Sequence, residues 1–210
     1  MAEWADQRGW QLSDAAALAR LSPYTFWKPS DQLVALLKLG DHVKLIFDLI
    51  TPEDGSPAGE RMWVQITERN QNDFIGQLDN EPRYVRDLPL GSMISFTAAH
   101  IIDSNIKDPV PDPTLKWQFR CFASNRILKD GAKIGFFYRE KPDKPEDSGW
   151  RFLCGDESGE YMDDTRNTQY VSLGAVLRCD DRVVYLLDQP APIDYEWDDK
   201  TQQFKAALSK

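Results

Sequence analysis

The segment of the chain with the densest potential chemistry is residues 147–164, DSGWRFLCGDESGEYMDD. It contains six carboxylates, three glycines and a single base, Arg151. Carboxylates at this density can bind a hard metal ion, serve a catalytic site, or border a surface that binds a basic protein. Each of these three roles requires a different spacing of residues, so the spacing helps to separate them.

The loop that follows Cys154 is the candidate for metal binding. Five oxygen ligands, Asp156, Glu157, Glu160, Asp163 and Asp164, fall within nine residues. A calcium loop of the helix–loop–helix type needs glycine at its sixth position and a bidentate glutamate at its twelfth. A loop that begins at the first of these acids has glycine fourth and asparagine twelfth, so the pattern does not match. We expect no metal and no cofactor, and we keep a metal- or small-ligand-binding regulatory module as the alternative hypothesis.

Residues suited to catalysis are few. The two histidines, His42 and His100, each lie beside a predicted strand. Ser148 lacks the G-x-S-x-G turn of activated serines. The acids that flank Cys154 are expected to raise the pKa of its thiol, which makes the thiol a poor nucleophile. We therefore predict a protein that is not an enzyme.

The charge of the chain points to a class of partner. The formal net charge is −9 at pH 7, and residues 141–199 hold fifteen acids against six bases. A negative field repels nucleic acids and steers basic proteins toward an encounter. The sequence has no apolar run of about 18 residues and begins without the basic and apolar stretches of a signal peptide. We predict a cytoplasmic protein that binds neither nucleic acid nor membrane; its oligomeric state stays open.

The elements of the N-terminal part begin with helices and continue as strands. Ser13 and Ser30 each precede an apolar run with helical spacing, which makes them candidate N-caps. After Gly40, apolar and polar residues alternate as in half-buried strands. The expected strands are HVKLIFDLI, ERMWVQITERN and DFIGQLDN, with the last two forming a hairpin.

A short internal similarity supports a bent sheet. The segments LKLGDHVKL (37–45) and LPLGSMISF (88–96) share the pattern Leu-x-Leu-Gly before alternating apolar residues. The glycines, Gly40 and Gly91, predict turns with positive φ just before a strand. These features predict a strongly bent antiparallel sheet or a small, partly closed barrel.

A proline-rich stretch separates this part from the rest. Three prolines within five residues in IKDPVPDPT indicate a linker. The segments beyond it predict strands in LKWQFRCFASNRIL, KIGFFYRE, GWRFLCG and IDYEWDDK, and a helix that begins after Ser172 and ends at Pro190. We predict an α+β protein with an N-terminal helix and connection (1–30), a β-rich domain of unknown function (31–112) and a smaller α+β domain (113–210).

The C-terminal part resembles a known family. The run GAKIGFFYREKPDKPEDSGWRFLCGDESGEYMDD, continued by YVSLGAVLRCDDRVVYLLDQP, is similar to the bacterial immunity proteins numbered thirty-three among the polymorphic-toxin immunity families. The resemblance covers about the last 90 residues. It is carried by Tyr-Arg-Glu-x-Pro (138–142), Asp-Ser-Gly-Trp-Arg-Phe (147–152), Gly-Asp-Glu (155–157) and Tyr-Met-Asp (161–163).

The N-terminal part resembles a second bacterial domain, one of unknown function, over residues 24–102. This resemblance is carried by YTFWKPS, LGDHVKLIF, ERMWVQITE and FIGQLDNEP. Neither resemblance brings catalytic residues with it.

The immunity-family resemblance implies a protein that binds a cognate toxin and blocks it. We predict that aromatic anchors and a border of carboxylates in residues 147–164 form the contact, although Trp150 is also a candidate core residue. A two-module adaptor that binds one protein with each half is a further hypothesis. The predicted partner-binding residues are Asp147, Trp150, Arg151, Asp156, Glu157, Glu160, Tyr161, Asp163 and Asp164.

Overall fold

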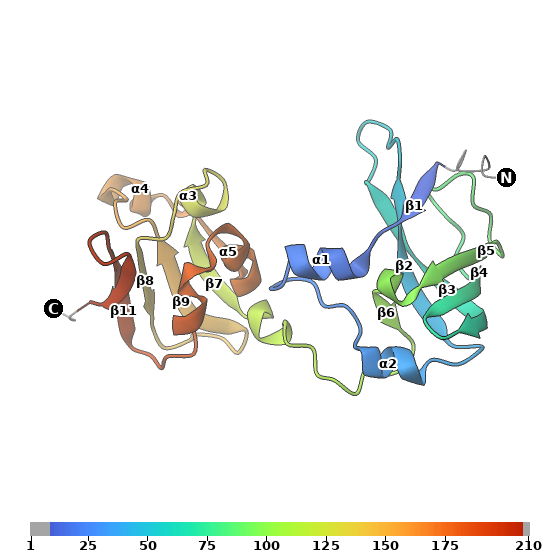
Figure 1. Ribbon diagram of the computed structural model, residues 1–210. Helices are drawn as coiled ribbons and strands as arrows, with labels where there is room; N and C mark the ends of the chain where they lie inside the picture. Colours follow the sequence, from blue (N-terminus) through green and yellow to red (C-terminus); the bar gives the residue numbers. More distant parts are fainter. Residues whose placement is uncertain (1–8, 208–210) are drawn as a thin grey trace. The chain divides into compact units, whose positions relative to one another are not determined.

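The computed structural model describes residues 9–207, and the chain divides into two compact units, Met1–Asp112 and Pro113–Lys210 (Figure 1). The expectation that the chain begins without a signal peptide falls mainly on residues 1–8, which lie outside the described part. Among the described residues, no helix has both the length and the apolar character needed to cross a membrane.

The N-terminal unit is built on one antiparallel sheet. Its strand order is β1-β2-β3-β4-β5, and β6 adds to β2. The sheet curls into a nearly closed barrel, in agreement with the predicted fold class. The strands are β1 (Trp10–Leu12), β2 (His42–Leu49), β3 (Gly59–Asn70), β4 (Asp73–Leu78), β5 (Met93–Thr97) and β6 (Asp103–Ser104).

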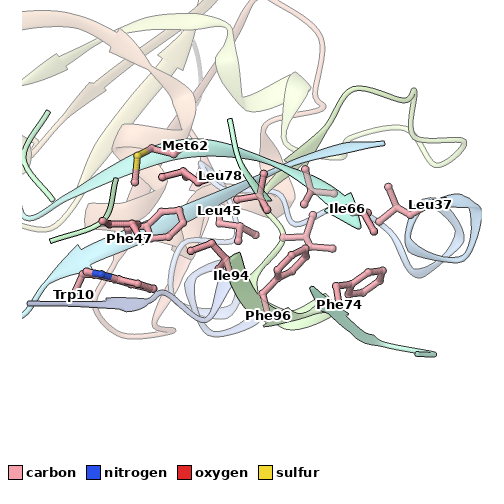
Figure 2. Close-up of a cluster of buried hydrophobic side chains, with 14 of the residues drawn as sticks. Trp10, Leu37, Leu45, Phe47, Met62, Ile66, Phe74, Leu78, Ile94 and Phe96 are labelled. Carbon is pink, nitrogen blue, oxygen red and sulfur yellow. The ribbon is translucent and has the colours of Figure 1, made fainter. Parts of the chain in front are cut away.

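Alternation of apolar and polar residues explains why these strands share one core. Side chains two positions apart on a strand point to the same face, and Val43, Leu45 and Phe47 of β2 are fully buried. Figure 2 shows this cluster, in which the Trp10 ring lies 5.1 Å from the Phe47 ring. The predicted hairpin is confirmed, because β3 and β4 pair in antiparallel register across a short turn.

Two short helices lie between β1 and β2 in the chain, and one begins later than predicted. Ser30 caps α2 (Asp31–Leu36) by accepting a hydrogen bond from Leu33 N, as expected. The first helix, α1 (Ala15–Leu21), is capped by Asp14 and not by Ser13. The reason is that the Ser13 N–H donates to Ile46 O, which continues the pairing of β1 with β2. The prediction for the first cap was therefore wrong by one residue.

Both glycines of the repeated pattern adopt the predicted conformation. Gly40 has φ +90° and Gly91 has φ +84°, which a residue with a Cβ atom rarely adopts. A 3-10 turn, η1 (Ala98–His100), follows β5.

The C-terminal unit is a mixed sheet with helices. Its strand order is β10-β7-β9-β8-β11-β12, and only β7 and β9 run parallel. The strands are β7 (Arg120–Ser124), β8 (Phe136–Arg139), β9 (Asp147–Leu153), β10 (Thr168–Ser172), β11 (Ile193–Asp198) and β12 (Gln203–Ala206). The helical elements are η2 (Leu115–Gln118), α3 (Asn125–Leu128), α4 (Gly159–Asp163), η3 (Thr165–Asn167), α5 (Leu173–Cys179) and η4 (Asp181–Leu186).

The sequence patterns predicted most of these elements, but they assigned two separate helical elements to a single helix. Ser172 caps α5 as predicted, by accepting from Ala175 N. The predicted single helix up to Pro190 is instead α5 followed by the 3-10 helix η4, because the Asp180 carboxylate caps a new start at Arg182 N. The strand β10 and the helix α4 were not predicted.

One face of this sheet carries the core of the unit. The Phe137 ring lies within 5.7 Å of four other aromatic rings, those of Trp150, Phe152, Tyr195 and Phe204. Buried residues of α5 and η4, such as Val176 and Val183, belong to the same unit. Residues at the alternate positions of the strands, such as Phe122, are mostly exposed or half-buried, whereas Arg151 of β9 is buried.

Candidate functional site

The structure separates the predicted site residues into an interior and an exterior group. Asp147, Trp150 and Arg151 lie on β9, between β7 and β8, and are 6%, 0% and 7% exposed. The Trp150 indole donates from Nε1 to Leu187 O at 3.2 Å. Trp150 is thus a core residue, so a protein that docks on the folded unit does not reach its ring.

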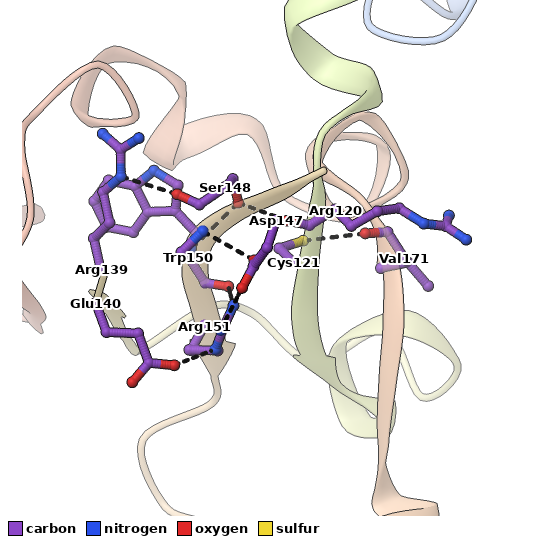
Figure 3. Close-up of polar contacts among 10 residues, drawn as sticks. Arg120, Cys121, Arg139, Glu140, Asp147, Ser148, Trp150, Arg151 and Val171 are labelled. Atoms are coloured by element: carbon purple, nitrogen blue, oxygen red, sulfur yellow. Dashed lines mark hydrogen bonds and ion pairs between the residues drawn. The ribbon is translucent and has the colours of Figure 1, made fainter. Parts of the chain in front are cut away.

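Arg151 is the centre of a buried polar cluster (Figure 3). Its guanidinium donates to both carboxylate oxygens of Asp147, at 3.0 and 2.8 Å, and to Glu140 Oε1 at 2.7 Å. A further bond to Trp150 O of 2.9 Å uses another N–H. These charge-assisted bonds hold the pKa of the Asp147 carboxyl below its ordinary value. The cluster therefore joins β9 to the end of β8.

A glycine makes this arrangement possible. Gly149 has φ +79°, and a Cβ atom at this position would lie 2.2 Å from Glu140 O. The register between β7 and β9 shifts in the same region, where a step of two positions along β7 corresponds to a step of four positions along β9. The irregularity lets Asp147 and Arg151 meet on one strand, as bulges commonly redirect side chains.

The exterior group lies in the loop and helix after β9, where most carboxylates already have partners. Asp156 forms a bidentate pair with Arg126, at 2.6 and 3.2 Å. Glu157 accepts hydrogen bonds from Cys154 N and Gly155 N, at 2.7 and 2.9 Å. These contacts hold the loop in shape and reduce the negative charge that it presents.

The helix α4 and its C-cap Asp164 contribute the remaining predicted residues. Asp164 accepts from Arg166 at 2.7 Å and caps η3, and the Tyr161 hydroxyl donates to Asn167 O at 3.3 Å. Glu160 and Asp163 are exposed and have no ion pair within residues 9–207. These two acids are thus the most available charges of the predicted site.

A row of side chains that sequence reasoning did not find crosses the other face of the sheet. Tyr170, Phe122, Arg151, Tyr138 and Asp194 are consecutive register partners on β10, β7, β9, β8 and β11. Register partners share a face of the sheet. The alternation of buried and more exposed residues along β7 and β8 indicated that each strand has two different faces. The pairing of the five strands could not be derived from this alternation.

The family comparison covers the unit that contains both groups. Residues 121–207 match the family model described as the Immunity protein Imm33 domain. The C-terminal unit carries an Imm33 domain. No curated protein and no solved structure matches the chain. The Imm33 match confirms the predicted family of this part, whereas the resemblance of the N-terminal part stays a prediction.

The net charge is distributed unequally between the two units. The N-terminal unit has seventeen acids and ten bases, a net charge of −7, whereas the unit with the Imm33 domain has seventeen acids and fifteen bases, or −2. The excess of acids in residues 141–199 is offset by bases outside that range, as in the pairs Asp156–Arg126 and Asp198–Lys205. The larger negative charge therefore belongs to the N-terminal unit, although a dense run of acids lies in residues 141–199.

Metal binding by the loop of the Imm33 domain is testable. Potential ligand atoms of Cys154, Asp156 and Glu157 lie within 4.8 Å of one another. The two carboxylates are already bonded as described, and burial together with Glu157 raises the pKa of the Cys154 thiol to about 12. We expect that calcium, manganese, magnesium or zinc ions leave the melting temperature of the chain unchanged, as measured by calorimetry. A rise that Asp156→Asn abolishes would instead support the metal hypothesis.

Proposed function

We propose that this chain is a non-enzymatic immunity protein that binds a cognate protein toxin and neutralises it, with the contact on the Imm33 domain. The match of residues 121–207 to the Imm33 domain is the observation that carries the proposal. A rigid binding surface is also consistent with the packing of this unit, whose sheet is closed on one side by a cluster of aromatic rings. We further propose that the protein acts in the cytoplasm.

The chemistry of the titratable groups favours binding over catalysis. Burial raises the pKa of the Cys121 and Cys154 thiols to about 12, so both are protonated at neutral pH. His42 and His100 belong to the N-terminal unit and not to the Imm33 domain. Protonated thiols are weak nucleophiles, which leaves surface recognition as the better supported role.

Capture of the partner from the native host tests the proposal. The tagged full chain is used as bait in a host lysate at low and high salt, and each retained protein is then expressed alone and together with the chain. We expect one retained protein that arrests growth when expressed alone and permits growth when the chain is present. Retention should be weaker at high salt if charge contributes to the contact.

An unrelated bait with the same net charge is the control for nonspecific capture. The proposal is contradicted if every retained protein is harmless when expressed alone. It is also contradicted if the chain fails to restore growth in the presence of the toxic one.

A further inference from the structure

We infer that the toxin-binding surface lies on the face of the Imm33-domain sheet opposite its aromatic core, and that its occupant is a basic, Arg- or Lys-bearing segment of the toxin. This inference rests on the proposed function and names the partner's chemistry. We call this surface the open face and define it by Phe122, Phe136, Tyr138, Asp194 and Glu196. These residues lie on β7, β8 and β11.

The open face carries aromatic rings that are exposed or half-buried. Phe122 is 41% exposed, whereas its neighbours on β7, Cys121 and Ala123, are buried. Its ring is 4.9 Å from that of Tyr170. On β8, the rings of Phe136 and Tyr138 lie 5.9 Å apart. Exposed aromatic rings on a fixed backbone are typical anchors of protein interfaces.

Buried Arg151 supports this face from within the sheet. Its guanidinium carbon lies 4.9 Å from the centre of the Phe122 ring. Because Asp147 and Glu140 bond the same guanidinium, the arginine is held in one position beside the ring. A surface held in this way loses little conformational freedom when a partner binds. Asp147 and Arg151 thus serve the contact by positioning, although neither is accessible itself.

The unpaired charge on the open face is negative. Asp194 faces Tyr138 and Glu196 faces Phe136 in the register of β11 with β8, and neither acid has an ion pair among the described residues. The charge of Arg151 is already matched by its two carboxylates. Unpaired carboxylates attract cations through their charge. Neighbouring aromatic rings attract the same cations through the ring quadrupole. This combination fits arginine and lysine side chains.

Two bases on this side of the sheet are either on a strand that does not neighbour those acids or already paired. Arg120 lies at the β7 end, with its guanidinium carbon 5.5 Å from the Tyr170 ring. Lys205, the register partner of Glu196, forms an ion pair with Asp198. The surroundings of Asp194 and Glu196 therefore complement a basic partner.

Matched charge removals on two surfaces test the inference. The double variant Asp194→Asn/Glu196→Gln alters the open face, and Glu160→Gln/Asp163→Asn removes the same number of charges from α4. Phe122→Ser removes an anchor ring. The affinity of each full-length variant for the growth-arresting toxin is measured by calorimetry at low and high salt, after thermal melting has shown that each variant is folded.

We expect the open-face double variant to bind at least about tenfold more weakly, with a flatter salt dependence. Phe122→Ser should lose about tenfold to hundredfold. The α4 variant should stay within about twofold of the unchanged chain.

The opposite pattern places the contact elsewhere. If the α4 variant loses affinity and the open-face variants keep it, the inference is overturned and the immunity function stands. If the unchanged chain binds no growth-arresting protein, the proposed function fails together with the inference. A dimer of the chain that Phe122→Ser dissociates, with toxin affinity unchanged, would assign the open face to a second copy.

Discussion

Replacing Trp150 by alanine is expected to lower the free energy of unfolding of the C-terminal unit by about 3–5 kcal/mol. The indole is fully buried and packs within 6.4 Å, between ring centres, of Phe137, Phe152 and Tyr195. The change leaves a cavity in this ring cluster and leaves Leu187 O without its 3.2 Å hydrogen bond. Urea titration, monitored by hydrogen exchange of the backbone amides of the C-terminal unit, measures this loss of unfolding free energy.

Tyr185→Ala is the matched control for this prediction. Tyr185 is an aromatic residue of the same unit but is 61% exposed, so its removal should not cause a comparable loss of stability. The comparison also separates the two roles predicted for Trp150 from the sequence. If Trp150→Ala kept full stability and lost only toxin affinity, the ring would be a contact and not part of the core.

Replacing Arg151 by leucine is expected to destabilise the same unit by about 3–5 kcal/mol, because Asp147 is then left buried without its partner. The Asp147 side chain is 4% exposed, and both of its oxygens bond the guanidinium. Arg166→Leu is the matched control, since that side chain is 87% exposed and its pair with Asp164 lies at the surface. A surface pair contributes little, so chemical denaturation should show no measurable loss for the control.

The same cluster predicts a dependence of stability on pH. Hydrogen bonds from Arg151 lower the pKa of Asp147 in the folded state, whereas an unfolded aspartate has a pKa of about 3.9. The cluster therefore contributes its full stability above about pH 4, and this contribution is lost as the pH falls through the lower folded-state value.

Denaturation between neutral and acidic pH measures this effect against Asp147→Asn. The variant should be less stable at neutral pH and should lose less stability on acidification. Parallel pH profiles of the two proteins would contradict the predicted contribution of the cluster.

Much of the local structure was determined by the sequence itself, because it depends on neighbouring residues. Alternation located β2 and β3, and the turn between β3 and β4 set the hairpin. Ser30 and Ser172 predicted helix starts, and the conformations of the two repeated glycines followed from their lack of a Cβ atom. Family-specific residues in the C-terminal part also predicted the Imm33 match.

Only the tertiary structure decided which of the chemically suggestive residues are available. Asp156 and Arg126 are 30 positions apart in the chain, and no spacing rule indicated that they would pair. Burial of Trp150 and Arg151 follows from the placement of β9 inside a sheet of six strands. The same pairing of distant strands created the open face. Side-chain type is a property of one residue, whereas exposure, partners and shared faces depend on where the chain returns. This is why the accessibility of the predicted site residues could not be derived from the sequence, while most elements could.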